Sequence, residues 1–550
     1  MRGRRLRFLI VAMIAAAMTA TAGAALKVKT GGTLVFGGSA DPTYLDPGLA
    51  SDGETFRVTE QMFETLVKLK PGTLKLVPWL ATSWKVSKDG KTFTFQLRKG
   101  VKFHDGTAFN AKAVCTNFNR WYNWTGPFQD ASATYYYQAA FGGFKKNQVS
   151  TLSPPLYKSC KAKGSSTAVV KLNRPSGTFI NWLVLQPFSM QSPTAMRKYG
   201  ADQGELKNGT FSPTGTYPFS HPTGTGPYKF VSWTIGQKVE LAKYARYWGQ
   251  KAKLDRLIIR PISTPTGRLQ ALQTGELNAY DLVAPQDISS IQGNGSLKVI
   301  KRPPFNVGYV TINSAHAPFN NPKVRQAIAY GLDRRTVVQQ FYYGTGVVAD
   351  DFLPAQLWGH SSKTVKYPYS PDKAKSLLRE AGLSLPVKVE FWYPTNITRP
   401  YMPDPKRNFE AFAASLENSG FKVEAHSAPW RPDYVKKVNE GSAGDLNMIG
   451  WTGDFGDPDN FLGTFFKTYS PQFGWKNNQV QKTLEQAAQQ TNQAKRKALY
   501  AKATYLVSKG VPAVPYVHTT PALGAQKKVV NLIATPTGGV WFGATTVGGQ

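Results

Sequence analysis

The sequence contains few acidic residues, only two cysteines and only six histidines in 550 positions. Its 33 Asp and Glu stand against 67 Lys and Arg, so the formal net charge at pH 7 is +34. Hydrophobic residues make up 41% of the chain and aromatic residues 13%, which excludes a disordered chain. At roughly 100–200 residues per domain, the length predicts about three to five domains.

Local motifs of common enzymes are absent. No histidine stands in an H-E-x-x-H or H-x-H arrangement, and there is no G-x-S-x-G elbow, Walker loop or G-x-G-x-x-G segment after a strand. His104 and Asp105 are adjacent, but the Asp-Gly pair at this point favours a turn over a catalytic dyad. We therefore expect no enzyme, no catalytic residues, no metal site and no cofactor.

The one long apolar run lies at the amino terminus. Arg2, Arg4, Arg5 and Arg7 precede apolar residues 8–21 and the small residues 22–25, an order that predicts a secretory signal peptide over residues 1–24. The apolar core is shorter than the roughly 20 residues of a membrane span, and no cysteine stands at the cleavage point for a lipid. We expect an exported chain in the periplasm or at the outer face of the cytoplasmic membrane.

Export also bears on the cysteines and on the charge. Outside the cytosol Cys115 and Cys160 are expected to form a disulfide, with two unpaired buried thiols as the alternative.

Strong positive charge is typical of nucleic-acid binding, but the basic residues form no blocks of five or six, so we expect no nucleic-acid partner. Anionic envelope surfaces are the expected electrostatic partner, and a merely solvated surface is the alternative.

Short strands and turns dominate the first 300 residues. A strand is expected at 32–37, and further strands at 168–172 and 256–260. Trp84 and Val86 before an Asp-Gly turn, with Phe93, Phe95 and Leu97 after it, predict a β-hairpin with one buried face. Residues 123–165, rich in Tyr, Gly, Ser and Lys, show no periodicity and are expected to form surface loops.

From about residue 305 helices and strands alternate. Asn321 and Pro322 begin one predicted helix, and Ser370 and Pro371 begin another. A strand at 387–393, a helix around 409–416 and a strand at 421–426 form a predicted β-α-β unit. The pattern indicates an α/β fold with a sheet covered by helices.

The segment 450–462 contains three aspartates, glycines and a proline, and it follows the apolar strand 446–449. Such a loop either caps its own backbone with Asp side chains or presents a carboxylate to a cationic ligand group.

Five segments together resemble the extracytoplasmic solute-binding proteins of peptide ABC transporters, most closely the dipeptide- and oligopeptide-binding members. They are 80–84, 97–106, 224–228, 322–328 and 450–462, in the order the family has. The resemblance implies a three-domain periplasmic-binding-protein-like α/β fold, with two lobes joined by a hinge and an extra domain inserted in the first lobe. Domain I would comprise 25–62, 194–304 and 517–550, domain II 63–193 and domain III 305–516.

The resemblance also implies a ligand site. Asp454 would bind the α-ammonium of a peptide, Arg399 would bind the C-terminal carboxylate of a dipeptide, and Trp430 would form an aromatic wall. Backbone near Ser51, Gly53, Gly450 and Thr452 would pair with the peptide like an added strand. Each charge of a buried zwitterion needs such a counter-charge.

The implied function is a monomeric receptor that captures peptides and delivers them to the permease subunits of an ABC transporter. A binding protein of the same fold for nickel, haem or an oligosaccharide is the alternative, and an exported hydrolase is a further one.

Overall fold

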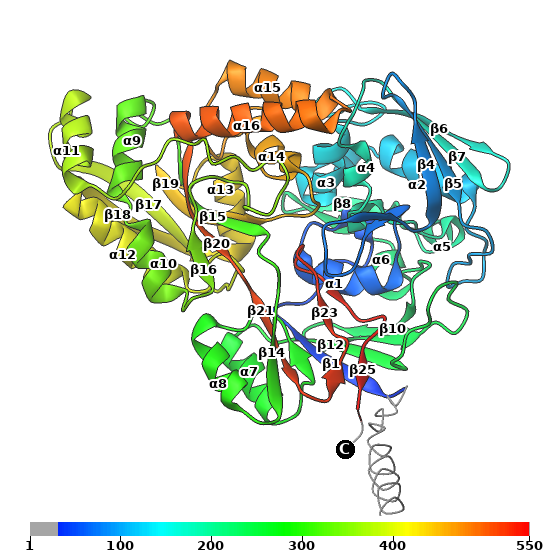
Figure 1. Ribbon diagram of the computed structural model, residues 1–550. Coiled ribbons are helices and arrows are strands. Elements are labelled where there is room, and N and C mark those ends of the chain that lie inside the picture. The colour runs from blue at the N-terminus through cyan, green and yellow to red at the C-terminus, as the bar shows by residue number, and fades with distance from the viewer. Residues whose placement is uncertain (1–30, 549–550) are drawn as a thin grey trace, which may run out of the picture.

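The computed structural model describes residues 31–548, and the predicted signal peptide, residues 1–24, lies outside them. Three larger sheets with covering helices make up the described chain. Figure 1 shows the sheet of β1, β12 and β14 below, the sheet of β15–β20 at the upper left, and the sheet of β4–β7 at the upper right. Within the described residues, no helix has the length and apolarity that a membrane span requires.

The first sheet draws its seven strands from three separate stretches of the chain. Across the sheet they are β10 (Tyr228–Thr234), β11 (Lys238–Lys243), β12 (Arg256–Pro261), β1 (Thr33–Gly38), β13 (Ala279–Tyr280), β21 (Ala522–Gln526) and β14 (Leu297–Lys301). Buried Leu34 and Phe36 pack with helix α1 (Gly53–Met62) on one face. Val35 faces the other side, where α7 (Pro265–Gln273) and α8 (Ile288–Gly293) lie. The strand predicted at 32–37 is confirmed.

The second sheet has six strands, in the order β16 (Gly346–Val348), β20 (Ala513–Thr519), β15 (Asn306–Ile312), β19 (Leu446–Thr452), β17 (Val387–Thr395) and β18 (Phe421–Pro429). Strands β17 and β18 are parallel and are joined by α12 (Pro405–Asn418), so the predicted β-α-β unit is confirmed. Its other helices are α9 (Pro322–Gly331), α10 (Arg334–Phe341), α11 (Pro371–Glu380), α13 (Val435–Glu440), α14 (Leu462–Phe466), α15 (Asn478–Gln489) and α16 (Gln493–Gly510). Asn321 and Ser370 cap α9 and α11 as predicted, each accepting a backbone N–H bond.

The third sheet contains the predicted hairpin, with a different turn. Its antiparallel order is β4 (Ala81–Val86), β5 (Thr92–Leu97), β7 (Thr167–Leu172) and β6 (Tyr157–Lys163). Phe93, Phe95 and Leu97 are buried, whereas Val86 is 43% exposed. In the turn, Gly90 has a φ of +66° but Asp89 does not have a positive φ, and Ser87 N–H bonds to Thr92 O. The connection is therefore longer than the two-residue primed turn that was expected.

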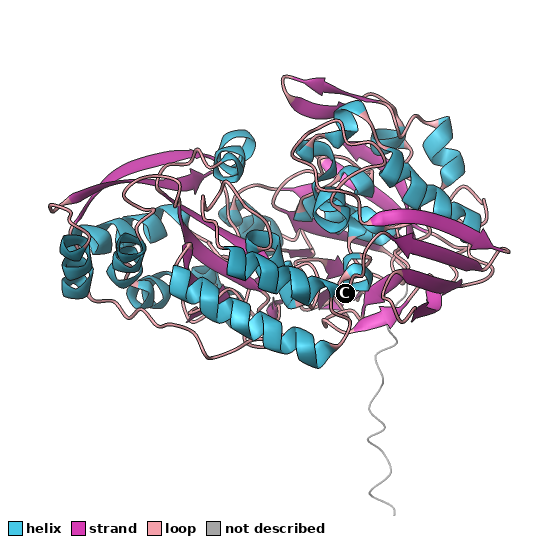
Figure 2. Cartoon of the chain, turned by 90° about the horizontal axis from the view of Figure 1, so that it is seen from above, coloured by secondary structure: helices cyan, strands magenta, loops and turns pink. Residues whose placement is uncertain are grey.

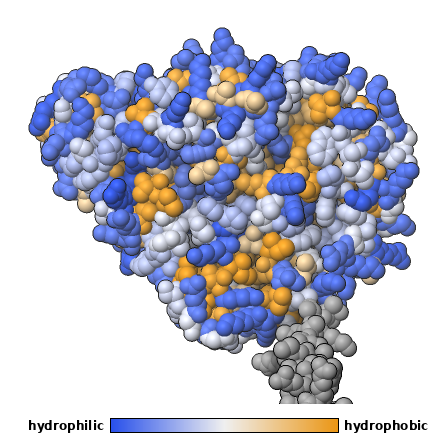
Figure 3. Space-filling model, viewed as in Figure 1, coloured by the Kyte–Doolittle hydropathy of each residue, from blue (hydrophilic) through white to orange (hydrophobic). Residues whose placement is uncertain are grey.

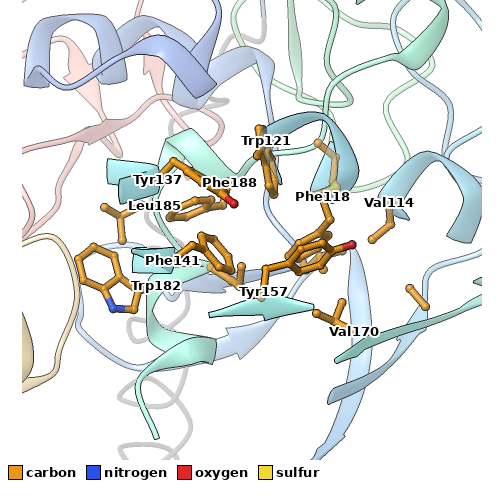
Figure 4. Close-up of a cluster of buried hydrophobic side chains, with 14 of the residues drawn as sticks. Val114, Phe118, Trp121, Tyr137, Phe141, Tyr157, Val170, Trp182, Leu185 and Phe188 are labelled. Carbon is orange, nitrogen blue, oxygen red and sulfur yellow. The ribbon is translucent and has the colours of Figure 1, made fainter. Parts of the chain in front are cut away.

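The expectation of surface loops over residues 123–165 is wrong. This stretch contains α3 (Ala131–Phe141) and β6, and Tyr137, Phe141 and Tyr157 are buried among the aromatic residues of α2 (Ala111–Asn123). Figure 4 shows these rings packed together. The tyrosines bury their rings because their hydroxyls find partners, as Tyr157 does by donating to Asn119 Oδ1 at 2.7 Å. A helix enclosed by aromatic neighbours shows no single apolar stripe.

Cys115 of α2 and Cys160 of β6 form a disulfide, so the helix is tied to an edge strand of this sheet.

The remaining elements are short and connect the larger ones. They are β2 (Val67–Leu69), β3 (Leu76–Pro78), α4 (Phe179–Trp182), α5 (Pro193–Lys198), β8 (Gly204–Lys207), β9 (Thr210–Pro213), α6 (Tyr217–Ser220), β22 (Val529–Val530), β23 (Ile533–Ala534), β24 (Val540–Trp541) and β25 (Thr546–Val547).

The chain crosses between the first and second sheets twice, from β14 to β15 and from β20 to β21. Hydrogen bonds join the two crossings: Arg302 N–H donates to Pro521 O at 2.7 Å. Asn306 Nδ2 donates to Thr519 O at 3.0 Å, and Thr519 N–H donates back to Asn306 Oδ1 at 3.0 Å. The predicted domain boundaries themselves stay a prediction.

Candidate functional site

The end of strand β19 presents an open backbone edge. Strand β17 pairs with β19 only through Leu446 and Asn447, so residues 448–452 have no neighbouring strand on that side. Tyr434 occupies the first position, where its hydroxyl bonds to both Met448 N and Met448 O. Because strand residues alternate, the backbone groups of Gly450 and Thr452 face the same way as those of Met448.

At Gly450 and Gly453 the strand end packs directly against two aromatic rings. A Cβ at Gly450 would lie 2.4 Å from the ring of Tyr401, and a Cβ at Gly453 would lie 2.2 Å from the ring of Phe305. Gly453 N–H also donates to Phe305 O at 2.8 Å, which fixes the turn that follows. The loop therefore leaves the strand in a fixed direction and carries Asp454 with it.

Asp454 has hydrogen-bond partners but no cation. Tyr136 OH donates to Oδ1 at 3.0 Å, and Asn460 Nδ2 donates to Oδ2 at 3.1 Å. Within residues 31–548 no Lys, Arg or His forms an ion pair with this carboxylate. Burial raises the pKa of Asp454 to about 7, because the ionised form lies away from water without a counter-charge.

Asp454 lines a hollow of about 780 Å³ that opens to solvent. Gly53, at the start of α1, lines the same hollow. The other lining residues come from α1, from β2 and the turn after it, from 184–186 and from the carboxyl-terminal segment: Phe56, Glu60, Lys68, Leu69, Lys70, Pro71, Thr73, Val184, Leu185, Gln186, Thr535, Thr537, Gly538, Gly539 and Trp541. Thr452 lies beside this hollow, since a Cβ at Gly538 would be 3.8 Å from its methyl group.

Arg399 lines a different, smaller hollow of about 330 Å³, next to the strand crossing at 519–522. Its guanidinium carbon lies 5.0 Å from the ring centroid of Trp430, which in turn stacks on Tyr434 at 6.1 Å. Arg399 Nε is buried without a hydrogen-bond partner, and no carboxylate in the described part of the chain pairs with the guanidinium. The side chain is thus able to bind an anion.

The structure brings some of the predicted site residues together and leaves others apart. Asp454 and Gly53 share one hollow, and Arg399 stacks on Trp430 beside another. The strand end from Gly450 to Asp454 lies between them, because Gly450 packs under Tyr401, two residues from Arg399. Ser51 and Gly450 line neither hollow.

Sequence reasoning missed Tyr136, Glu60, Lys68 and the carboxyl-terminal segment 535–541. Tyr136 lies within residues 123–165, whose sequence shows no helical periodicity. No local signal marks the others, because the hollow is assembled from segments at opposite ends of the chain. Among residues 31–548, no three His, Cys, Asp or Glu side chains gather closely enough to hold a metal ion.

The parts of the molecule that carry α4 and the β19 loop touch directly. Asn181 Nδ2 donates to Asp457 Oδ2 at 2.8 Å, and the ring of Trp182 lies 4.9 Å from that of Phe455. Asp457 is also held by both terminal nitrogens of Arg496, at 2.7 and 2.8 Å.

Comparisons with known proteins agree on one family. The family model of bacterial extracellular solute-binding proteins, family 5 Middle, matches residues 75–473. The chain is 30% identical over 531 residues to the dipeptide-binding protein of Escherichia coli K12, covering 94% of each chain. It is also 30% identical over 545 residues to heme-binding protein A of Haemophilus influenzae, covering 96% of this chain and 95% of that protein.

A solved structure matches with a TM-score of 0.80 and 28% identity, covering 94% of this chain and 98% of the other. It is the ABC transporter-associated periplasmic binding protein DppA from Helicobacter pylori in complex with the peptide STSA. The expected periplasmic-binding-protein-like α/β fold is therefore confirmed. With most of its length matched by the model and by these relatives, the chain belongs to the bacterial extracellular solute-binding proteins of family 5.

Proposed function

We propose that this protein captures di- or oligopeptides outside the cytoplasm and delivers them to the permease subunits of an ABC transporter. The observation that carries the proposal is Asp454, a partly buried carboxylate without a cation at the end of an open strand edge. A peptide supplies what both features lack, because its α-ammonium is a cation and its backbone can pair with an edge.

In this proposal the α-ammonium binds Asp454 and the peptide backbone runs along Gly450 and Thr452, with Ser51 and Gly53 on the opposite side. Arg399, held by Trp430, binds the C-terminal carboxylate of a ligand short enough to reach it. The protein binds as a monomer by hinge closure, the motion known for periplasmic binding proteins, and performs no chemical conversion. Export by the signal peptide over 1–24 and the predicted domain boundaries belong to the same proposal.

A haem receptor is the second candidate, because the chain is as similar to heme-binding protein A as to a dipeptide-binding protein. Nickel and oligosaccharide receptors remain further alternatives. Lone charges of opposite sign on Asp454 and Arg399 favour a zwitterion over these ligands.

Mass spectrometry of small molecules released from the purified protein distinguishes these candidates. We expect the released molecules to be peptides. Peptides incubated with the protein should be recovered intact, with no hydrolysis products. Haem absorption in the purified protein and no peptide release would overturn the proposal. Calorimetry with synthetic di-, tri- and pentapeptides then gives the preferred length.

Retention at an anionic envelope surface is a separate part of the proposal. Helix α16 contains five basic residues and no acidic one, and Lys495, Lys502 and Lys509 recur every seven residues on its exposed side. Figure 1 places α15 and α16 at the upper end of the molecule, and Figure 2 shows two long helices side by side there. Hydrophilic residues cover most of that edge in Figure 3. Anionic lipid head groups or wall polymers fit this row of lysines.

A further inference from the structure

Glu60 faces the same hollow as Asp454, farther along α1. Gly53, Phe56 and Glu60 recur at helical spacing and all line the hollow, which places Glu60 about 10 Å along the axis from Gly53. The ring of Phe56 lies 5.8 Å from that of Tyr136, the residue that bonds to Asp454. Glu60 is therefore about one helical turn beyond the Asp454 end of the hollow.

The carboxylate of Glu60 has no direct partner. Within residues 31–548 it forms no ion pair and accepts no hydrogen bond, and burial raises its pKa. Gly539 has no side chain, and this makes room for the carboxylate, because a Cβ at this position would lie 2.5 Å from Glu60 Oε2. The backbone of Gly539 is itself held by Arg302, whose guanidinium donates to Gly539 O at 2.6 Å.

The neighbouring carboxylate of Glu64 is satisfied by neutral donors. Both of its oxygens accept two hydrogen bonds at 2.6–2.8 Å, from Trp79, Tyr247, Thr225 and Trp248. Burial raises the pKa of Glu64, and the four donors, among them an indole N–H on each oxygen, oppose that rise by favouring the ionised form. In that form Glu64 adds a negative charge close to the hollow.

Lys68 is the cation between these two acids. Its Nζ lies 3.4 Å from the ring centroid of Trp541 and 4.9 Å from that of Trp79, so the ammonium is held on aromatic faces. Glu60 and Glu64 both act on Lys68 electrostatically, and one ammonium thus serves two carboxylates.

The nearby arginines do not neutralise the excess negative charge, because each is paired with other acids. Arg57 bonds to Glu54 and Asp281, and Arg302 bonds to both oxygens of Asp281. These two cations are matched by two anions. Lys70 also lines the hollow, but its side chain is exposed to solvent. Away from solvent, the single ammonium of Lys68 therefore remains against three carboxylates, those of Glu60, Glu64 and Asp454.

We propose that Glu60 receives a second cationic group of the ligand, so that the site selects peptides whose first residue is lysine or arginine. This inference rests on the proposed function and specifies its substrate class. The α-ammonium at Asp454 balances one excess negative charge, and the basic side chain at Glu60 balances the other. A neutral side chain leaves Glu60 with only the ammonium of Lys68, which it shares with Glu64.

Calorimetry with three dipeptides tests the assignment: Lys-Ala, norleucine-Ala, which has a similar chain but no ammonium, and Glu-Ala. A charge-assisted hydrogen bond gives an expected preference of about 10- to 100-fold for Lys-Ala over norleucine-Ala, with Glu-Ala weakest. In Glu60→Gln the ratio between the first two should fall to about one. Glu440→Gln, an exposed acid of α13, should keep the wild-type ratio.

The outcomes separate the two proposals. Equal binding of Lys-Ala and norleucine-Ala by the wild type overturns the role of Glu60 and leaves peptide binding intact, and this comparison needs no variant to fold. An unchanged ratio in Glu60→Gln also overturns it. Failure of all three dipeptides, and of longer peptides, to bind overturns the proposed function and this assignment with it.

Discussion

Asn181 donates a hydrogen bond to Asp457 at 2.8 Å, and this bond joins α4 to the loop that carries Asp454. Neither residue lines the hollow of Asp454. The bond therefore holds α4 against the loop after β19 and makes no contact with a ligand in the hollow.

Removing this contact should speed ligand release. In Asn181→Ala, Asp457 keeps Arg496, so only one bond is lost, and a net hydrogen bond contributes about 0.5–1.5 kcal/mol. We expect the dissociation rate measured by stopped flow to rise roughly three- to tenfold, with little change in the association rate. The exposed Asn418→Ala serves as the control. An unchanged dissociation rate would show that this bond does not hold the two parts together around the ligand.

Asp454→Asn should abolish most peptide binding and leave the fold intact. The variant removes the counter-charge of the buried α-ammonium, at a cost of roughly 3–5 kcal/mol of binding free energy. Thermal unfolding should show no loss of stability, because the native carboxylate is buried without a cation. Calorimetric affinity within a factor of three of wild type would remove Asp454 from the site. Asp372→Asn, on the exposed side of α11, is the matched control.

Peptide affinity should rise with pH through about 7. The raised pKa of Asp454 means that the ligand-free protein holds a proton there below about pH 7, and an ammonium ligand must displace it. Affinity should fall up to about tenfold per pH unit below that value, with proton uptake by the buffer on binding. Calorimetry in buffers of different ionisation enthalpy measures this release. Binding at pH 6 without proton release would contradict the assignment.

Arg399→Ala should weaken dipeptide binding more than pentapeptide binding. A guanidinium in a fixed position reaches the C-terminal carboxylate at one ligand length only. We expect the dipeptide affinity to fall about tenfold or more, whereas that of the pentapeptide stays within a factor of three. Arg335→Ala, an exposed arginine of α10, is the control. Comparable affinities for all lengths, unchanged in Arg399→Ala, would falsify the binding of the C-terminal carboxylate by Arg399.

The lysine row of α16 should mediate binding to anionic surfaces. Each basic residue near such a surface contributes about 1 kcal/mol, so changing Lys495, Lys502 and Lys509 to Gln should abolish co-sedimentation with anionic vesicles at about 20 mM salt. Changing Lys251, Lys527 and Lys528 to Gln removes the same charge elsewhere and should have little effect. Wild-type binding that survives about 1 M salt, where the Debye length is about 3 Å, would exclude electrostatic retention.

Much of the fold followed from local pattern, but the site followed only in part. The β-α-β unit and the caps of α9 and α11 were predictable because periodicity and capping residues act over a few positions. The buried tyrosines of 123–165 were not, since their burial depends on partners such as Asn119 that the periodicity of the segment does not show. Asp454 was a candidate because of the resemblance to a known family, and its role stays a prediction. Glu60 and Trp541 share its hollow only through the tertiary fold.

If the chain is exported as proposed, the position of β21 between β13 and β14 constrains the order in which it becomes functional. A chain that crosses a membrane amino terminus first delivers residues 522–526 near the end, so the first sheet is split until they arrive. The segment that carries Gly539 and Trp541 follows later still. A chain halted in translocation would therefore have most of its domains folded and no completed hollow, which postpones ligand capture until the whole receptor has left the translocation channel.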